Sequence, residues 1–282
     1  MKIAYWEVQV DIKKAIEDRG HEALGLDWHD PKWPKLFSGL SCDVFIWYPH
    51  ALHSQGHKLF ERSFFIENFL NIRCYPGTRS AYLFQDKIRQ KYVFDHYGIP
   101  TPQTQILRTN KDVIDFLEKT SYPFLVKDVW GYGGYGIEMI RSKKQGEEFL
   151  RKKRIPKKEK NTKKEKFVYV QEVIDVVEEY RIITLGDKVL LSYGKKSDKF
   201  LKHVWRGAQI SFDIDRKIIQ KVKNWNKKLK LDWCGWDLIK DKDGSVYLLE
   251  INPIFGTKVL ESQGVNLADH LLDYVLLPQN KK

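Results

Sequence analysis

The chain has 282 residues, of which 42% are hydrophobic, and a formal net charge of +12. This composition is typical of a globular protein with a large core, in one elaborate domain or a few small ones. Cys42, Cys74 and Cys234 stand far apart, which argues against a disulfide framework and a thiolate zinc site. Because no signal-peptide pattern is found and no apolar run reaches the roughly 18 residues of a membrane span, we expect a cytoplasmic protein.

Most of the excess positive charge lies in residues 151–166, which hold ten basic residues and two glutamates and so carry +8. The other 266 residues carry only +4, as an ordinary solvated surface does. Repulsion between like charges predicts that this segment is a solubilising loop. Binding of nucleic acid or of an acidic partner by the segment stays open as an alternative.

The first part of the chain predicts a small α/β unit. Its expected elements are a strand at 3–8, a helix at 11–20, a strand at 44–47 and a helix through Phe60, Phe64 and Phe69. A break at Tyr75-Pro76-Gly77 ends this unit. We then expect one helix at about 79–97, because Gly98 and Pro100 follow as stop signals.

Strands dominate the remainder of the chain. The expected elements are a strand at 103–107, a helix at 110–119, strands at 123–129, 137–140 and 167–174, a hairpin of 180–185 with 188–192, a helix at 214–228, a second hairpin about Asp243-Gly244, and a last helix with Leu267, Leu271, Leu272 and Val275 on one side. Helices and strands therefore mix along the chain, without an internal repeat.

The second hairpin carries three oxygen donors, Asp237, Glu250 and Asn252. If Lys240 faces Ser245, then Asp237 faces Leu248, and the period of two places Glu250 and Asn252 on the same face. Hard oxygens without histidine or cysteine suit a magnesium ion that takes further ligands from water and substrate phosphates. The alternative is a solvated hairpin face without a function.

A lysine and a glycine run follow one another in the middle of the chain. Alternation places Lys127 on the same strand face as Leu125, where an ammonium needs an anion opposite it. The glycine flap, Gly131–Gly136, allows backbone amides to approach phosphate oxygens. A strand is expected after the flap, so the run does not fit the dinucleotide fingerprint, which must open a helix. A structural hairpin loop is the alternative.

The strand at 167–174 ends beside charged residues. Its backbone could meet an adenine edge, and the carboxylate of Glu179 could take ribose hydroxyls. The alternative is an edge strand with a surface ion pair between Glu179 and Arg181.

Three histidines, His50, His53 and His57, could line an acceptor pocket with Tyr48 and Trp6. A zinc or nickel site is less well supported, because Gly56 interrupts the helical spacing, and ordinary surface histidines remain the simplest interpretation.

In this order along the chain, from about Asp86 to Pro253, these motifs resemble those of the ATP-grasp superfamily. The greatest similarity is to glutathione-synthetase-like and glutamate-adding carboxylate–amine ligases. The resemblance implies a mixed α/β (α+β) ATP-grasp fold. It also implies three domains: an N-terminal α/β pre-grasp domain at 1–86, a first grasp subdomain with the glycine flap at 87–172, and a second subdomain with the metal site at 173–282.

The same resemblance implies a role for each matching residue. The phosphates would be contacted by Lys87, Lys127, Gly133 and Gly134, adenine by Glu172, Val173 and Ile174, and ribose by Glu179. The Mg²⁺ ion would be held by Asp237, Glu250 and Asn252. Arg181 would act at the phosphate site, and the acyl phosphate would be bound by Lys195, Lys196 and Arg206. Two departures, the long basic segment and Trp6-Glu7 where small residues are usual, leave the substrate open.

The implied function is an ATP- and Mg²⁺-dependent ligase that joins a small-molecule carboxylate to an amine through an acyl phosphate. The substrate could be an amino acid, a peptide or a sugar, and a homodimer is left open. The alternatives are an ATP-grasp phosphotransferase acting on a small-molecule hydroxyl and a non-enzymatic nucleic-acid binder that uses residues 151–166.

Overall fold

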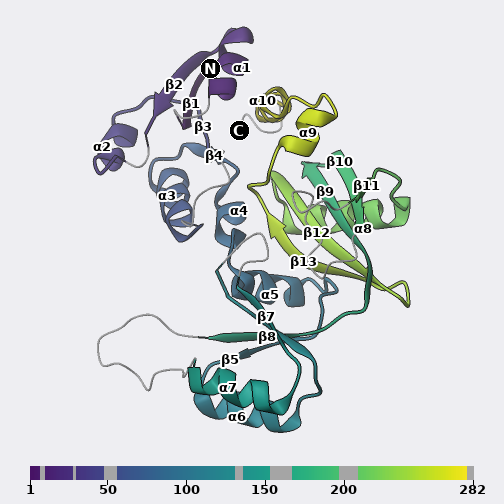
Figure 1. The fold of residues 1–282 in the computed structure, drawn as a ribbon. Helices are drawn as coiled ribbons and strands as arrows, with labels where there is room; N and C mark the ends of the chain where they lie inside the picture. The colour runs from purple at the N-terminus through teal and green to yellow at the C-terminus, as the bar shows by residue number, and fades with distance from the viewer. Residues whose placement is uncertain are drawn as a thin grey trace.

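The computed structural model describes residues 1–6, 10–27, 30–47, 56–130, 136–152, 167–196 and 209–277. Three sheets follow one another from the N-terminus, and helices pack between and around them (Figure 1). No helix in these described ranges has the length and apolar character needed to cross a bilayer.

The N-terminal sheet is parallel and buried on both faces. It has the order β2-β1-β3-β4 and comprises β1 (Lys2–Trp6), β2 (Glu22–Leu26), β3 (Val44–Ile46) and β4 (Arg73–Tyr75), with α1 (Val10–Asp18), α2 (Trp33–Ser38) and α3 (Gly56–Phe69). Ile3 and Tyr5 enter one core cluster, whereas Ala4 and Trp6 enter another. The predicted α/β unit is confirmed, although β2, α2 and β4 were not expected.

The single helix expected at about 79–97 is wrong. The chain forms α4 (Thr78–Leu83) and α5 (Lys87–His96) instead. Gln85 has φ of 55°, and the carboxylate of Asp86 caps α5 by accepting the N–H groups of Ile88 and Arg89, both at 3.0 Å. A left-handed residue followed by an N-cap ends one helix and begins another, so Lys87 lies in the first turn of α5.

The second sheet is antiparallel and has helices on one face. Its order is β5-β8-β6-β7, with β5 (Thr104–Leu107), β6 (Phe124–Lys127), β7 (Ile137–Ile140), β8 (Val168–Glu172), α6 (Asn110–Lys119) and α7 (Lys143–Lys152). Phe124, Val126, Val168 and Val170 pack with residues of α6 and α7. Because side chains alternate, Lys127 and Gln171 lie on the other face.

The third sheet, of order β11-β10-β9-β12-β13, is also antiparallel. Its elements are β9 (Val176–Leu185), β10 (Lys188–Lys196), β11 (Gln209–Ser211), β12 (Trp233–Asp241) and β13 (Val246–Asn252), followed by α9 (Lys258–Ser262) and α10 (Leu267–Val275). The helix α8 (Arg216–Leu229) covers one face by packing on Tyr180, Ile182 and Trp236. On the opposite face, Ile183, Leu185 and Trp233 pack in a core with residues of the N-terminal unit and α10, and other positions carry polar groups.

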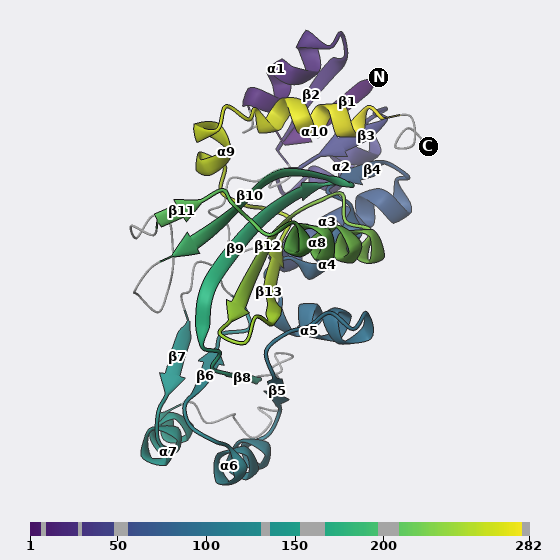
Figure 2. The same ribbon diagram turned by 90° about the vertical axis from the view of Figure 1, so that its right-hand side faces the viewer.

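The end of the chain returns to its beginning, and α10 lies beside α1 in both views (Figures 1 and 2). Arg19, the residue after α1, pairs with Asp269 and Asp273 of α10, each at 2.8 Å. The half-buried Asp232 accepts the N–H of Gly77 at 2.7 Å through its side chain and that of Gly186 at 2.6 Å through its carbonyl. The N-terminal sheet is therefore fixed to the third sheet.

Replacing Gly186 by alanine should weaken this junction. Gly186 has φ of +52°, and a Cβ there would lie 2.7 Å from Cε2 of Tyr274 in α10. Gly244 has φ of +85° with open space around it, so Gly244→Ala isolates the backbone cost of about 1 kcal/mol. We expect Gly186→Ala to lower the free energy of unfolding in urea by about 1 kcal/mol more than Gly244→Ala does. Equal losses would contradict the packing of α10 on this turn.

Candidate functional site

A row of charged side chains crosses the third sheet on the face opposite α8. The strand register pairs Lys195 with Glu179, Arg181 with Asp237, and Asp237 with Glu250. These side chains are only 12–25% exposed. Residues opposite one another in neighbouring strands share a face, so the register brings groups from four strands into one site.

The hairpin register differs from the prediction. Asp237 pairs with Glu250 and not with Leu248, because Lys240 pairs with Val246 rather than Ser245 and a bulge follows between Asp237 and Leu238. A bulge adds a residue to one strand and shifts every later pair. The shared face survives the shift: the Asn252 side-chain amide donates to Oε1 of Glu250 at 3.1 Å. The three predicted oxygen donors therefore lie together.

Arg181 occupies the middle of the row. Nη1 of Arg181 contacts Oδ2 of Asp237, and the guanidinium lies against Gly235, where any Cβ would collide with it. Burial acts to lower the pKa of Arg181, but Asp237 together with Tyr193, Cys234 and Glu250 outweighs this effect, and the pKa is raised above its ordinary value. Arg181 is thus a permanent cation in a partly dry site.

Lys195, which the resemblance placed with Lys196 and Arg206 at the acyl phosphate, is a member of this row. Its Nζ lies 3.5 Å from Oε2 of Glu179 and 3.9 Å from Oδ1 of Asp237. The predicted Lys196 pairs with Gln209 through β10 and β11, and its side chain lies outside the described residues. The alternation of the hairpin about Gly186-Asp187 was the signal that could have selected Lys195.

Lys127 faces this row from the second sheet. Its Nζ donates to Oε1 of Gln171 at 2.5 Å, and Nε2 of Gln171 donates to Oγ1 of Thr104 at 2.9 Å. Burial lowers the pKa of Lys127 to about 8; Glu250 opposes this shift and Lys87 adds to it. The Lys127 ammonium is therefore desolvated, and no carboxylate of the described residues lies within ion-pair distance of it.

Lys87 joins the two sheets. Its Nζ lies 4.0 Å from Oε2 of Glu250. The backbone places it there, because the Lys87 N–H donates to the carbonyl of Val129 at 3.2 Å and Asp86 forms a bridge with Trp130. The start of α5 is thus tied to the residues that follow β6, and both predicted phosphate lysines lie near the carboxylates.

The glycine flap connects two strands, as its sequence predicts. Asp128 donates its N–H to the carbonyl of Gly136 at 2.8 Å. Gly136 has φ of +74°, and a Cβ would collide with the Asp128 carboxyl group. Only a glycine fits this position without strain. Gly133 and Gly134 lie outside the described residues.

The predicted adenine segment follows β8. The Glu172 N–H donates to the carbonyl of Gln103 at 3.0 Å, and its Oε1 accepts the Gln103 N–H at 2.6 Å. The Glu172 N–H therefore already donates a hydrogen bond within the protein. The expected adenine contacts would have to come from the Glu172 carbonyl and from Val173 and Ile174. Glu172 and Val173 line a cavity of about 1050 Å³ together with Asp175 and Lys242.

Several other predicted groups cannot be placed. Arg206, Tyr48, His50, His53 and residues 153–166 lie outside the described residues, as does the side chain of His57. Trp6 lies in the core of the N-terminal unit with 4% exposure, packed among Phe37, Phe45 and Trp47, which does not support its role in an open acceptor pocket.

A magnesium ion fits the donor set chemically. The described residues contain no group of three His, Cys, Asp or Glu side chains arranged around a metal. Two carboxylates and one amide, from Asp237, Glu250 and Asn252, nevertheless converge beside two cations, Arg181 and Lys87. A small set of hard oxygens is what Mg²⁺ uses when water and phosphate oxygens complete its shell.

The fold and the site together define an ATP-grasp enzyme. Lys87 and Lys127 lie on one side of the site, and the carboxylates of the third sheet lie on the other. The pattern of the RimK-like ATP-grasp domain matches residues 84–275, and the chain belongs to this family. It is an ATP-grasp ligase, and the members of this class use ATP. The predicted superfamily, mixed fold and ligase class are confirmed.

Relatives and a solved structure agree with this assignment. The chain is 22% identical over 205 residues, 70% of its length and 68% of the relative's, to the coenzyme gamma-F420-2:alpha-L-glutamate ligase of Methanococcus maripaludis. It is 25% identical over 257 residues, 86% of its length and 74% of the relative's, to a D-alanine–D-alanine ligase of Pseudomonas fluorescens. Its fold is similar to that of a RimK domain ATP-grasp protein from Sphaerobacter thermophilus, with a TM-score of 0.68, 15% identity and coverage of 98% of this chain and 100% of that chain.

The buried ammonium of Lys127 should make stability depend on pH. Between a folded pKa of about 8 and the higher unfolded value, only the unfolded state keeps the proton, so stability rises with pH. Tyrosines that titrate in the same pH range do so in both proteins, so their effect on stability cancels when wild type is compared with Lys127→Met. We expect wild-type protein to gain about 2 kcal/mol relative to this variant between pH 7.5 and pH 10, measured by urea unfolding. A difference that does not change with pH would show that Lys127 is solvated.

Proposed function

We propose that this protein is an ATP- and Mg²⁺-dependent carboxylate–amine ligase that forms an amide through an acyl phosphate. One observation carries the proposal: the lysines of the first half, Lys87 and Lys127, meet the carboxylate row of the third sheet, with Nζ of Lys87 at 4.0 Å from Oε2 of Glu250. Cations and carboxylates facing one another suit a bound polyphosphate with its metal ion.

The nucleotide would lie between the second and third sheets. Lys87 and Lys127 would bind phosphate oxygens, and the desolvated Lys127 ammonium gains the anion that its position lacks. The glycine flap, including Gly133 and Gly134, would cover the phosphates with backbone amides. Adenine would contact the segment at Val173 and Ile174, and Glu179 would accept hydrogen bonds from ribose.

Asp237, Glu250 and Asn252 would hold the magnesium ion, which when bound neutralises phosphate charge during transfer. The protein's own contribution is to orient these oxygens. Arg181 holds the Asp237 carboxylate, and the Asn252 amide holds Glu250. Both supports fix their carboxylates on the cleft face of the sheet.

The substrate carboxylate would take the γ-phosphoryl group of ATP, giving an acyl phosphate and ADP. An amine would then attack the carbonyl carbon, and phosphate would leave as the amide forms. Arg181 and Lys195 lie where they could stabilise the negative charge on oxygen, and Lys196 and Arg206 are further candidates for this role. Closure over the site would keep water from the acyl phosphate.

We further propose that one substrate is an amino acid. A relative named as a glutamate ligase and another named as a D-alanine–D-alanine ligase support this class. The cytoplasmic location remains part of the proposal, and the three free cysteines are consistent with a reducing compartment.

Removal of one carboxylate tests the metal assignment. Glu250→Gln keeps the shape of the side chain and removes its charge, so we expect ATP turnover to fall by about 100-fold or more while the unfolding midpoint stays within a few degrees. Asp243→Asn removes an exposed charge from the turn of the same hairpin and serves as the matched control, with turnover close to wild type. Unimpaired turnover in Glu250→Gln would exclude the assignment.

Phosphate release tests the reaction class. Amino acids and small carboxylates are supplied in pools, and we expect phosphate release from ATP to require a carboxylate and an amine together. The reason is that the acyl phosphate forms from a carboxylate and loses its phosphate when an amine attacks it. Product mass should equal the two substrates minus one water. A phosphorylated alcohol with no need for an amine would instead identify a phosphotransferase.

A further inference from the structure

The helix α8 carries an unusual concentration of positive charge. From Arg216 to Lys230 the chain has seven basic residues and no Asp or Glu. The whole chain carries +12, of which residues 151–166 contribute +8 and residues 216–230 contribute +7, so the remainder is at −3. Outside those two segments the protein is therefore slightly acidic, and α8 is the positive surface within the described ranges.

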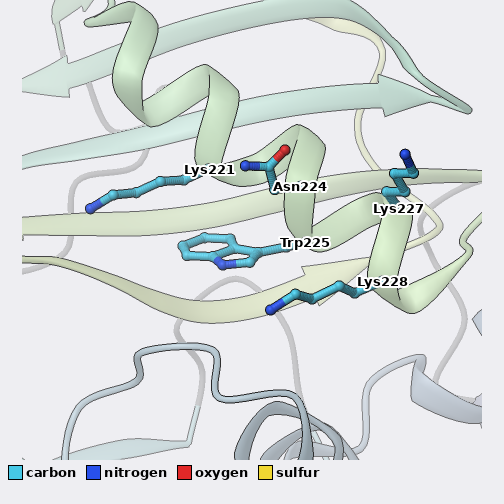
Figure 3. A pocket seen from close by; sticks show the side chains of 5 residues that line it. All are labelled: Lys221, Asn224, Trp225, Lys227 and Lys228. Atoms are coloured by element: carbon cyan, nitrogen blue, oxygen red, sulfur yellow. The ribbon is translucent and has the colours of Figure 1, made fainter.

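All seven basic side chains are exposed. They are Arg216, Lys217, Lys221, Lys223, Lys227, Lys228 and Lys230. Figure 3 shows Lys221 and Lys228 extending on either side of the Trp225 ring, with Lys227 pointing away from them. Within the described parts of the chain none of the seven forms an ion pair, whereas Ile218, Val222 and Trp225 are buried against the sheet.

Helix stability does not explain this charge. Arg216 and Lys217 lie at the N-terminal end, where the helix dipole disfavours cations. Lys217 with Lys221, and Lys223 with Lys227, are like-charge pairs at i,i+4, which each cost about 0.2–0.5 kcal/mol.

Two other helices pair their lysines with acidic side chains. In α1, Lys14 lies 2.6 Å from Asp18 and Lys13 lies 3.8 Å from Glu17, and in α5 Lys91 contacts Asp95. The seven basic residues of 216–230 have no such partners among the described residues, which sets α8 apart from α1 and α5, and a departure of this kind is typical of functional surfaces.

We propose that α8 is a docking surface for an acidic polypeptide segment. The carboxylates of a chain rich in Asp and Glu complement a cationic helix about 21 Å long. A hollow of about 500 Å³, lined by Lys221, Asn224, Trp225, Lys227 and Lys228, lies along this helix and has room for a few side chains (Figure 3). Ammonium groups surround it, so its chemistry selects for anions.

A polypeptide fits this surface better than a nucleic acid does. Single-stranded nucleic acid needs aromatic rings on which bases stack, and the Trp225 ring is 7% exposed. Bidentate phosphate recognition uses arginine, and Arg216 is the one arginine among the seven cations. The side chains of α8 are point charges on flexible stems, which suit dispersed carboxylates.

Docking here would not obstruct the nucleotide cleft, because α8 covers one face of the third sheet and the charged row lies on the other. The proposal does not rest on the ligase chemistry, since binding can be measured without ATP. A partner held at α8 would remain attached while the cleft opens and closes.

The test is the affinity of the full chain for a fluorescein-labelled peptide of about ten glutamates, followed by fluorescence anisotropy over a range of salt concentrations. The variant is K221E/K227E/K228E, and the control is K111E/K143E/K144E, which makes the same change in net charge at exposed lysines of α6 and α7, away from α8. We expect the first to weaken binding about tenfold or more and the control less than about threefold. ATP turnover and the unfolding midpoint should stay unchanged in both.

Three results would overturn the proposal. Equal loss in both variants would show that only net charge matters. If deletion of residues 153–164 abolished binding while the α8 variant kept wild-type affinity, the peptide would bind that segment and not α8. Tighter α8-dependent binding of a single-stranded oligonucleotide with the same number of charges would identify a nucleic-acid surface instead.

Discussion

The site depends on the desolvated ammonium of Lys127. A buried cation is costly unless an anion meets it, and its hydrogen bond goes to the neutral amide of Gln171. The lowered pKa, about 8, expresses that cost. The cost would fall if phosphate oxygens occupied the space beside Lys127, and the relief of this cost would favour binding of the proposed nucleotide.

The third sheet supplies the opposite half of this electrostatic arrangement. Alternation along β9, β10, β12 and β13 sends apolar residues toward α8 and charged ones toward the cleft. Gly235 is essential to that face, because its missing side chain leaves the space that the Arg181 guanidinium fills. Arg181 in turn holds the Asp237 carboxylate in place beside Glu250 through their contact.

Motifs with a period of two were the most predictable part of the molecule. The positions of Lys127 and the hairpin donors follow from alternation. A one-residue slip in the hairpin would have separated its donors, but the bulge adds a second residue to the shift, so Asp237 and Glu250 still share a face. The bulge at Asp237, the left-handed Gln85 and the resulting break between α4 and α5 depend on local backbone geometry that no periodicity reports. The choice of Lys195 over Lys196 also depends on strand pairing, because the contact of Lys195 with Glu179 joins β10 to β9.

Charge acts differently on the two faces of the third sheet. On the cleft face, Arg181 and Lys195 are paired with carboxylates and largely buried, so their positions are fixed and weakly screened by salt. On the α8 face the lysines are exposed, lack ion-pair partners among the described residues and are strongly screened. Fixed charges suit chemistry on a small, precisely held substrate, whereas mobile surface charges suit the capture of a larger and less ordered anion. One sheet therefore separates the two kinds of recognition, and changes in salt concentration should affect them unequally.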